Sequence, residues 1–129
     1  MQAIILLGGQ GTRLRKLYPD RPKALVPVAG KPFIERQIDW LRRGGVKEIH
    51  CAAGHMAEQI EAWAKSQKDV SVSREPKPLG TGGAVKFVEP HIHSDPFLVV
   101  NGDTLLPNLD FQRLPARRWS IELAGPDDM

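Results

Sequence analysis

Apolar and polar positions along the chain follow two spacings, one typical of strands and the other typical of amphipathic helices. Short apolar runs bounded by turn residues predict strands. These strands are expected at residues 3–7, 48–53, 70–74, 97–101 and 119–124. The first run is continuous and is ended by Gly8 and Gly9, as expected of a strand that is buried on both faces.

Between the strands, apolar residues recur at three- and four-residue spacing, which predicts three helices. Their apolar faces are formed by Ile34, Ile38 and Leu41 in the first, Met56, Ile60 and Trp63 in the second, and Ala84, Val85 and Val88 in the third. Pro32 opens the first helix, and Gly44 and Gly45 close it. The third begins near Thr81 and is ended by Pro90.

The regular alternation of strands and helices, joined by short loops with glycine or proline, indicates parallel strands with right-handed helical crossovers. The expected fold class is therefore α/β, with an open, mainly parallel sheet. Ligands of such sheets bind at the carboxyl ends of the strands. Chemistry is expected just after Leu7, Arg74 and Val100.

Length and composition fit one compact domain, since the chain has 129 residues of which 41% are hydrophobic. No apolar run approaches the ~20 residues that cross a bilayer, and no positively charged segment precedes the first apolar stretch. We therefore expect a cytoplasmic protein without a membrane partner. The single cysteine, Cys51, lies in an apolar stretch and is expected to be a buried structural thiol.

The net charge of +3 is unevenly distributed. Residues 1–31 carry six cations against one anion, and the remainder of the chain has a small negative balance. A cluster of positively charged side chains beside a glycine-rich loop suits a small polyanion such as a triphosphate better than the long backbone of a nucleic acid.

The loop after the first predicted strand is the segment 8–15, GGQGTRLR. Its glycines let backbone N–H groups approach phosphate oxygens, while its arginines supply charge. Two other phosphate loops do not match, because the segment lacks both a Gly-Lys-Ser/Thr triplet and the third glycine of a dinucleotide loop. The acid of a dinucleotide site is also absent after the second strand, which argues against an oxidoreductase fragment.

Residues 6–35, LLGGQGTRLRKLYPDRPKALVPVAGKPFIE, resemble the signature of sugar-1-phosphate nucleotidyltransferases, in which a G-G-x-G-T-R-L loop is followed by P-K. The resemblance implies a doubly wound, Rossmann-like α/β fold. It also implies that Arg13 contacts the β- and γ-phosphates of a nucleoside triphosphate and that Lys23 reaches the α-phosphate. An in-line displacement at phosphorus needs such cations around the reacting group. Arg15, Lys16 and Arg21 are interpreted as solvated charges.

Residues 75–84, EPKPLGTGGA, match a second motif of the family, E-x-x-P-L-G-T-G-G-A, which recognises the base. By this resemblance, Glu75 contacts the base through its side chain and Gly80 through its main chain. Guanine offers a carboxylate two adjacent donors, whereas uracil and thymine offer one. GTP is therefore the favoured nucleotide, and the alternative is that Glu75 is only a charged residue at a strand end.

Residues 101–103, Asn-Gly-Asp, match a third family motif. An acid at the carboxyl end of a strand lies where a Mg²⁺ ligand is needed, and we assign Asp103 to that ligand. The catalytic residues are thus predicted to be Arg13, Lys23 and Asp103. The residues predicted to bind the nucleotide are Leu7, Gly8, Gly9, Gly11, Thr12, Arg13, Lys23, Glu75, Gly80, Thr81 and Asn101.

The histidines and tryptophans receive less specific interpretations. His91 and His93 with Asp95 resemble a metal site in spacing, but a solvated loop is preferred because they follow Pro90 and lead into a strand. His50 and His55 show no pattern of interest. Trp40, Trp63 and Trp119 are interpreted as core or interface residues.

The predicted function is transfer of a nucleoside monophosphate from a nucleoside triphosphate, GTP favoured, to a sugar 1-phosphate, with release of pyrophosphate. Among family members, the guanylyltransferases that act on manno-heptose 1-phosphate are the most similar. The alternatives are a uridylyltransferase acting on an amino-sugar or hexose 1-phosphate, and a non-catalytic nucleotide-binding or regulatory module. A module without catalysis is expected to lose Arg13, Lys23 or Asp103, and all three are present.

The resemblance also carries an expectation about domain content. In the family, a following half of the fold supplies most of the sugar pocket and a second aspartate for Mg²⁺. Residues 1–129 are therefore expected to be the nucleotide-binding part, without the C-terminal sugar-binding part. The expected partners are the two substrates and no nucleic acid, and self-association is left open.

Overall fold

A computed structural model describes residues 1–7, 20–77, 79–94, 97–102 and 119–122 of the chain. Its main feature is a five-stranded sheet in the order β5-β4-β1-β6-β7. The strands are β1 (Gln2–Leu7), β4 (Glu48–Ala53), β5 (Val70–Arg74), β6 (Phe97–Asn101) and β7 (Trp119–Glu122). All four neighbouring pairs are parallel, which confirms the predicted α/β class.

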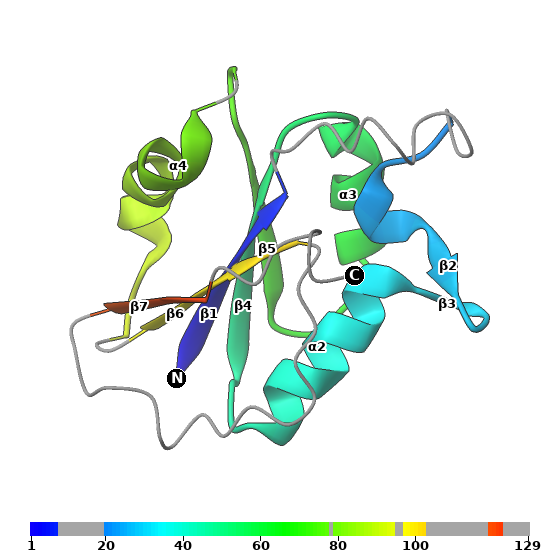
Figure 1. Ribbon diagram of the computed structural model, residues 1–129, viewed down its shortest axis with the longest axis horizontal. Coiled ribbons are helices and arrows are strands. Elements are labelled where there is room, and N and C mark those ends of the chain that lie inside the picture. The colour runs from blue at the N-terminus through cyan, green and yellow to red at the C-terminus, as the bar shows by residue number, and fades with distance from the viewer. Residues whose placement is uncertain (8–19, 78, 95–96, 103–118, 123–129) are drawn as a thin grey trace.

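The helices lie on both faces of this sheet (Figure 1). Helices α2 (Phe33–Arg43) and α3 (Ala57–Ala64) cover one face, and α4 (Gly80–Val88) with the short 3₁₀ turn η2 (Glu89–His91) covers the other. The chain starts at the central strand, moves outward through β4 to β5, and returns to β6 on the other side of β1. The strand order therefore reverses between β1 and β6, the place where doubly wound sheets bind ligands.

Alternate residues of the strands fill two separate cores. On β1, Ala3 and Ile5 pack beneath α2 and α3, while Ile4 packs beneath α4 with Val88. This alternation follows from the pleat, since successive side chains of a strand point to opposite faces. A strand with both faces covered reads as a continuous apolar run, and the first predicted strand is such a run.

Helix α2 has the predicted boundaries and buried face. Pro32 caps its start, Gly44 caps its end, and the following Gly45 has a φ of +102° that favours glycine. The predicted apolar residues of this helix are all buried, namely Ile34, Ile38 and Leu41.

Helix α3 differs from its prediction at its first residue. Met56 was expected to begin the apolar face, but it precedes the helix with a left-handed φ of +56°. The buried face is instead made by Ala57, Ile60 and Ala64, and Trp63 is only partly buried. Periodicity detected the helix because Ile60 lies on its buried face, but it could not detect the turn that reorients the chain at Met56.

Two small elements near the start of α2 were not predicted. A 3₁₀ turn, η1 (Lys23–Leu25), leads into a hairpin of β2 (Pro27–Val28) and β3 (Lys31–Pro32). The hairpin turns at Ala29 and Gly30, both with positive φ. Separately, none of the helices in the described part of the chain is long and apolar enough to span a membrane.

Candidate nucleotide-binding site

The three strand ends at which chemistry was expected meet at one edge of the sheet. Leu7 at the end of β1 lies opposite Ala53 of β4, which in turn lies opposite Arg74 of β5. On the other side of β1, Leu6 lies opposite Asn101 of β6. The register therefore brings the segments after Leu7, Arg74 and Asn101 to the same edge, around the point where the strand order reverses.

Gly102 prolongs the contact between β6 and β1 beyond the last strand residue. Its N–H donates a hydrogen bond of 2.9 Å to the carbonyl oxygen of Leu6. A Cβ at this position would lie 2.5 Å from Cδ2 of Leu7 and 2.9 Å from the Leu6 oxygen. Only glycine fits so close an approach. The sequence motif did not indicate this steric role of Gly102.

Gln37 is a further residue whose role was not predicted. It lies in the apolar stripe of α2, fully buried, and its Nε2 donates a hydrogen bond of 3.0 Å to the carbonyl oxygen of Asn101. The sequence could have indicated this role. A glutamine on an apolar helix face, next to Ile38, is expected to be buried, and a buried amide requires a hydrogen-bond partner.

Glu75 follows β5 and is only 9% exposed. Its N–H donates a hydrogen bond of 2.7 Å to the carbonyl oxygen of Ala53. Burial raises the pKa of the Glu75 carboxyl, while a hydrogen bond from the Leu79 backbone acts in the opposite direction. The Glu75 carboxylate is therefore largely buried beside the start of α4, where it accepts a hydrogen bond from the Leu79 backbone.

The start of α4 depends on a second glycine. Gly80 opens the helix with a φ of +72°, a conformation that side chains disfavour. Thr81, which follows it, lies in the first turn of α4. The nucleotide-binding role of both residues stays a prediction.

Lys23 begins the turn η1, which is anchored at both ends. The N–H of Leu25 donates to the carbonyl oxygen of Pro22 at 3.0 Å, and the N–H of Phe33 donates to that of Val26 at 3.0 Å. Because Phe33 is the first residue of α2, the segment after Lys23 is attached directly to that helix.

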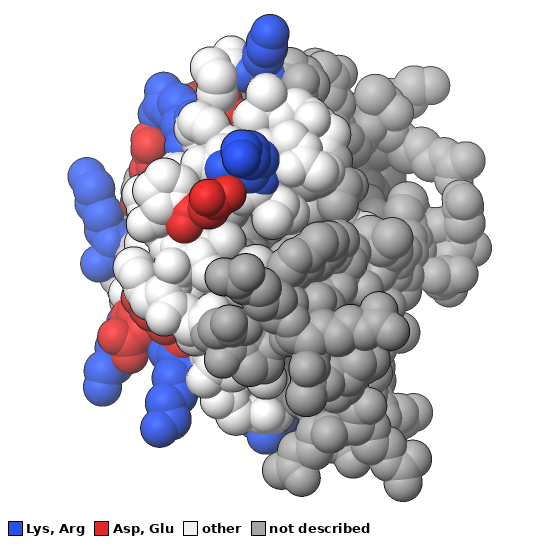
Figure 2. Space-filling model, turned by 90° about the vertical axis from the view of Figure 1, so that its left-hand side faces the viewer, with Lys and Arg blue, Asp and Glu red and all other residues white. Residues whose placement is uncertain are grey.

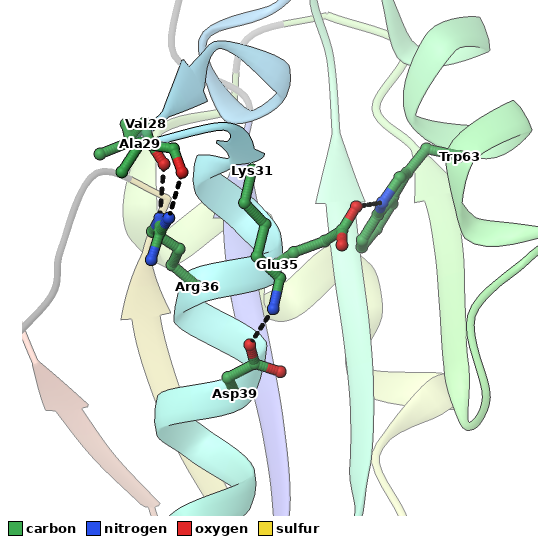
Figure 3. Close-up of polar contacts among 7 residues, drawn as sticks. All are labelled: Val28, Ala29, Lys31, Glu35, Arg36, Asp39 and Trp63. Carbon is green, nitrogen blue, oxygen red and sulfur yellow. Dashed lines mark hydrogen bonds and ion pairs between the residues drawn. The ribbon is translucent and has the colours of Figure 1, made fainter.

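Side chains of α2 fix the hairpin and a neighbouring helix (Figure 3). Nε and Nη2 of Arg36 donate to the carbonyl oxygens of Val28 and Ala29 at 2.6 and 2.9 Å. Nζ of Lys31 pairs with Asp39 at 2.5 Å. On the side facing α3, Oε2 of Glu35 accepts a hydrogen bond of 3.0 Å from Nε1 of Trp63. Helix α2 is thus a common support for the hairpin, for α3 and for the end of β6.

The remaining predicted site residues lie outside the described residues. They are Gly8, Gly9, Gly11, Thr12, Arg13 and Asp103. Three further residues discussed above also lie outside the described residues, namely Arg15, Lys16 and Asp95. The predicted cluster of positive charge near the glycine-rich loop is therefore described only in part. On the face drawn in Figure 2, the described basic side chains lie among acidic ones. Lys86 of α4 also pairs with Glu89, at 3.8 Å.

His50, which showed no pattern of interest in the sequence, makes specific contacts in the structure. Its ring is buried, with Nδ1 at 2.7 Å from Oγ of Ser71 and Nε2 at 2.9 Å from Oγ of Ser73. The ring also stacks on His91 at 4.4 Å. Burial, helped by the nearby charges of His91 and His93, lowers the pKa of His50 to about 4. These partners lie on other strands and turns, so no local pattern predicted them.

Two other assignments concern metal and thiol chemistry. Among the described residues, no three His, Cys, Asp or Glu side chains are grouped to hold a metal ion. Cys51 is buried, as predicted, and burial raises the pKa of its thiol to about 12.

Comparison with known proteins places these features in a family. The family described as Nucleotidyl transferase matches residues 2–118. The chain is 38% identical over 127 residues to D-glycero-alpha-D-manno-heptose 1-phosphate guanylyltransferase of Campylobacter jejuni, covering 96% of this chain and 57% of the relative. It is also 38% identical over 112 residues to mannose-1-phosphate guanylyltransferase catalytic subunit beta of Xenopus tropicalis, covering 81% of this chain and 31% of the relative.

Solved structures show the same similarity. HddC from Yersinia pseudotuberculosis complexed with GMP-PN matches with a TM-score of 0.75 and 36% identity, covering 86% of this chain and 51% of that one. The inositol-1-phosphate CTP transferase from T. maritima matches with a TM-score of 0.73 and 25% identity, covering 82% and 45%. The chain spans about half the length, or less, of these proteins. With the match to residues 2–118, the shared parallel fold and these identities, the chain belongs to the nucleotidyl transferase family.

Proposed function

We propose that this chain provides the nucleotide-binding part of a site that transfers a nucleoside monophosphate, GMP favoured, to a sugar 1-phosphate. A manno-heptose 1-phosphate is the favoured acceptor, since relatives with this specificity in their names cover nearly the whole chain. The observation that carries the proposal is the meeting of the ends of β1, β5 and β6 at one edge, with the enclosed carboxylate of Glu75 beside them.

The reaction is an in-line displacement at the α-phosphorus. An oxygen of the sugar 1-phosphate forms a bond to this phosphorus, the bond from phosphorus to the α–β bridging oxygen breaks, and pyrophosphate leaves with the electron pair. Lys23 is proposed to contact the α-phosphate, and Arg13 the β- and γ-phosphates. The protein needs to supply little beyond positioning and positive charge for such a step.

Mg²⁺ is the proposed cofactor, and the available donors suit it. Gly102 lets β6 end close against β1, which brings the backbone before Asp103 to the edge where β1 leads into the glycine-rich loop. The carboxylate of Asp103 is a hard oxygen ligand of the kind that Mg²⁺ prefers, and a bound ion would take further ligands from water and substrate phosphates. When bound, Mg²⁺ would neutralise negative charge on the triphosphate.

Base selection is proposed to depend on Glu75. A carboxylate accepts hydrogen bonds only, and guanine can donate two to it where a pyrimidine such as uracil donates one. Each hydrogen bond to a charged group contributes about 1.5–3 kcal/mol, so GTP should bind roughly 10- to 150-fold more tightly than UTP.

The test is calorimetric titration of the full chain with GTP, UTP, dTTP and CTP, each with and without Mg²⁺. Glu75→Gln should weaken GTP binding by at least about tenfold and affect UTP less. Glu58→Gln, on the exposed side of α3, is the matched control and should leave both affinities unchanged. Equal affinity of the unaltered chain for GTP and UTP contradicts the base assignment, and absence of binding by every nucleotide contradicts the proposed function.

A coupled assay for pyrophosphate release, with a panel of heptose and hexose 1-phosphates, separates transfer from binding alone. Release that requires one sugar 1-phosphate identifies the acceptor. Tight nucleotide binding with slow or no release agrees with a chain that provides only the nucleotide-binding part of the site, and a non-catalytic or regulatory module would give the same result. Preference for UTP together with an amino-sugar 1-phosphate favours the uridylyltransferase alternative.

A further inference from the structure

The buried amide of Gln37 is directed at the edge of the sheet where the site is proposed. Gln37 has no exposed surface, and its Nε2 donates to the carbonyl oxygen of Asn101 at 3.0 Å. Burial of an amide costs free energy unless it is hydrogen-bonded, so a leucine would be the simpler choice for this position between Ile34 and Ile38. One partner of this buried amide is the end of β6, through the carbonyl oxygen of Asn101.

That strand end is held from two directions. The carbonyl oxygen of Asn101 accepts from Gln37 of α2, and the N–H of the next residue, Gly102, donates to Leu6 of β1 at 2.9 Å. The close fit of Gly102 against Leu6 and Leu7 leaves no room for displacement toward β1. The backbone that leads into Asp103 is therefore fixed by one helix and one strand.

The same helix is fixed to the segment after Lys23. The N–H of Phe33 donates to Val26, and Arg36 holds the carbonyl oxygens of Val28 and Ala29 (Figure 3). Arg36 and Gln37 are neighbours in sequence, so adjacent residues of one helix hold the hairpin and the end of β6. Helix α2 is therefore bonded both to the segment that follows Lys23 and to the end of β6, to which the proposed function assigns phosphate binding and metal binding.

We propose that Gln37 is a positioning residue for nucleotidyl transfer, acting through the Asn101 carbonyl to fix the Asn101–Gly102 turn against the segment that follows Lys23. The inference rests on the proposed function, because it concerns the placement of a magnesium ligand relative to a phosphate-binding lysine. Gln37 touches neither substrate nor metal in this role. Its removal should alter the response to Mg²⁺ rather than the affinity for the base.

The chain offers a matched control in Gln2, which is 2% exposed. Its Nε2 donates to the carbonyl oxygen of His91 at 2.8 Å, and its Oε1 accepts from the N–H of His93 at 2.8 Å. Gln2 begins β1 and therefore lies at the amino edge of the sheet, opposite to the proposed site. Replacement of either glutamine by methionine removes a buried amide at similar volume.

The experiment compares Gln37→Met and Gln2→Met in the full chain by two measurements. The first is hydrogen exchange of the Gly102 amide, normalised to that of the buried Ile5 in the middle of β1. Exchange at Gly102 should rise at least about tenfold in Gln37→Met and remain within about twofold of the unaltered chain in Gln2→Met. The second is GTP affinity with and without Mg²⁺. Gln37→Met should reduce the Mg²⁺-dependent gain in affinity about tenfold while the Mg²⁺-free affinity stays within about twofold.

A third variant covers the case in which Gln37→Met does not fold. Gln37→Asn keeps the amide but withdraws it by roughly 1.5 Å, the length of one C–C bond, so it should give the same two changes. Equal Gly102 exchange and an equal Mg²⁺ response in the Gln37 variants and in Gln2→Met overturn the positioning role alone. Failure of the unaltered chain to bind any nucleotide overturns the proposed function and this inference with it.

Discussion

Replacement of Gly102 by alanine tests the geometry at the point where β6 meets β1. The added Cβ would lie 2.5 Å from Cδ2 of Leu7 and 2.9 Å from the carbonyl oxygen of Leu6. The end of a leucine side chain can move, but the Leu6 oxygen belongs to the central strand and accepts the hydrogen bond of Gly102 itself. The clash therefore cannot be relieved without separating the two strand ends.

The expected cost combines two effects. Overpacking of a fitted position costs about 1–3 kcal/mol, and weakening of the hydrogen bond between Gly102 and Leu6 costs about 1 kcal/mol. Gly102→Ala should therefore lower the free energy of unfolding by about 2–4 kcal/mol. Gly82→Ala is the matched control, since Gly82 lies exposed in the first turns of α4 with no atom within 4 Å of its added Cβ. It should be neutral or stabilise the fold by up to about 1 kcal/mol.

The assay is urea unfolding at pH 7 followed by tryptophan fluorescence, with free energies compared only where the dependence on urea is unchanged. A free energy of unfolding for Gly102→Ala within about 0.5 kcal/mol of the unaltered chain would refute the close approach of Gly102 to β1. A loss of similar size in Gly82→Ala would show that the method responds to any glycine replacement.

Two further predictions concern buried titratable groups. The pKa of His50 is lowered to about 4 in the folded protein from 6.5, so the unfolded chain binds the proton more readily and stability falls as the pH falls from about 6.5 toward 4. Between pH 7 and pH 5 the resulting loss in the free energy of unfolding is about 2 kcal/mol. His50→Gln should remove this part of the pH dependence of urea unfolding. An unchanged pH dependence in this variant would contradict the burial of a neutral His50 ring. Cys51, whose thiol pKa is raised to about 12, should not react with a thiol-specific disulfide reagent at pH 8 until the chain is unfolded. Rapid labelling under native conditions would show that the core beneath α2 and α3 opens readily.

Much of the fold could be predicted from the sequence, because its strands are short segments with sharp ends that are either largely apolar, as in residues 3–7, or alternate apolar and polar residues, as in Val70–Arg74. The strands Glu48–Ala53, Val70–Arg74 and Phe97–Asn101 have the predicted boundaries. The hairpin β2–β3 was missed since strands of two residues carry no period, and its turn uses alanine where asparagine would be a clearer signal. Met56 was misassigned because it has an apolar side chain at helical spacing but a left-handed backbone.

The site was predictable in outline for a different reason. Strand ends of a parallel sheet meet at one edge, so the positions after Leu7, Arg74 and Val100 could be grouped from the amino-acid sequence alone. The partners of Gln37 and His50 could not, because each bond joins segments that are distant in the chain, 64 residues apart for Gln37 and Asn101. Predictions for Arg13 and Asp103 remain predictions, since both lie outside the described residues.

The position of β1 at the centre of the sheet has a consequence for how the chain can fold during synthesis. Gln2 pairs with Glu48 on one side and with Phe97 on the other, so its second neighbour is about 95 residues later in the chain. At about 5–20 residues per second, a ribosome would need roughly 5–20 s to add that stretch. Until β6 has been synthesised, the edge of β1 that pairs with it has no partner strand, although β1 is the most apolar strand of the sheet. Folding of this family member should therefore wait for β6, and nascent chains that end before it are the ones most exposed to aggregation or to capture by chaperones.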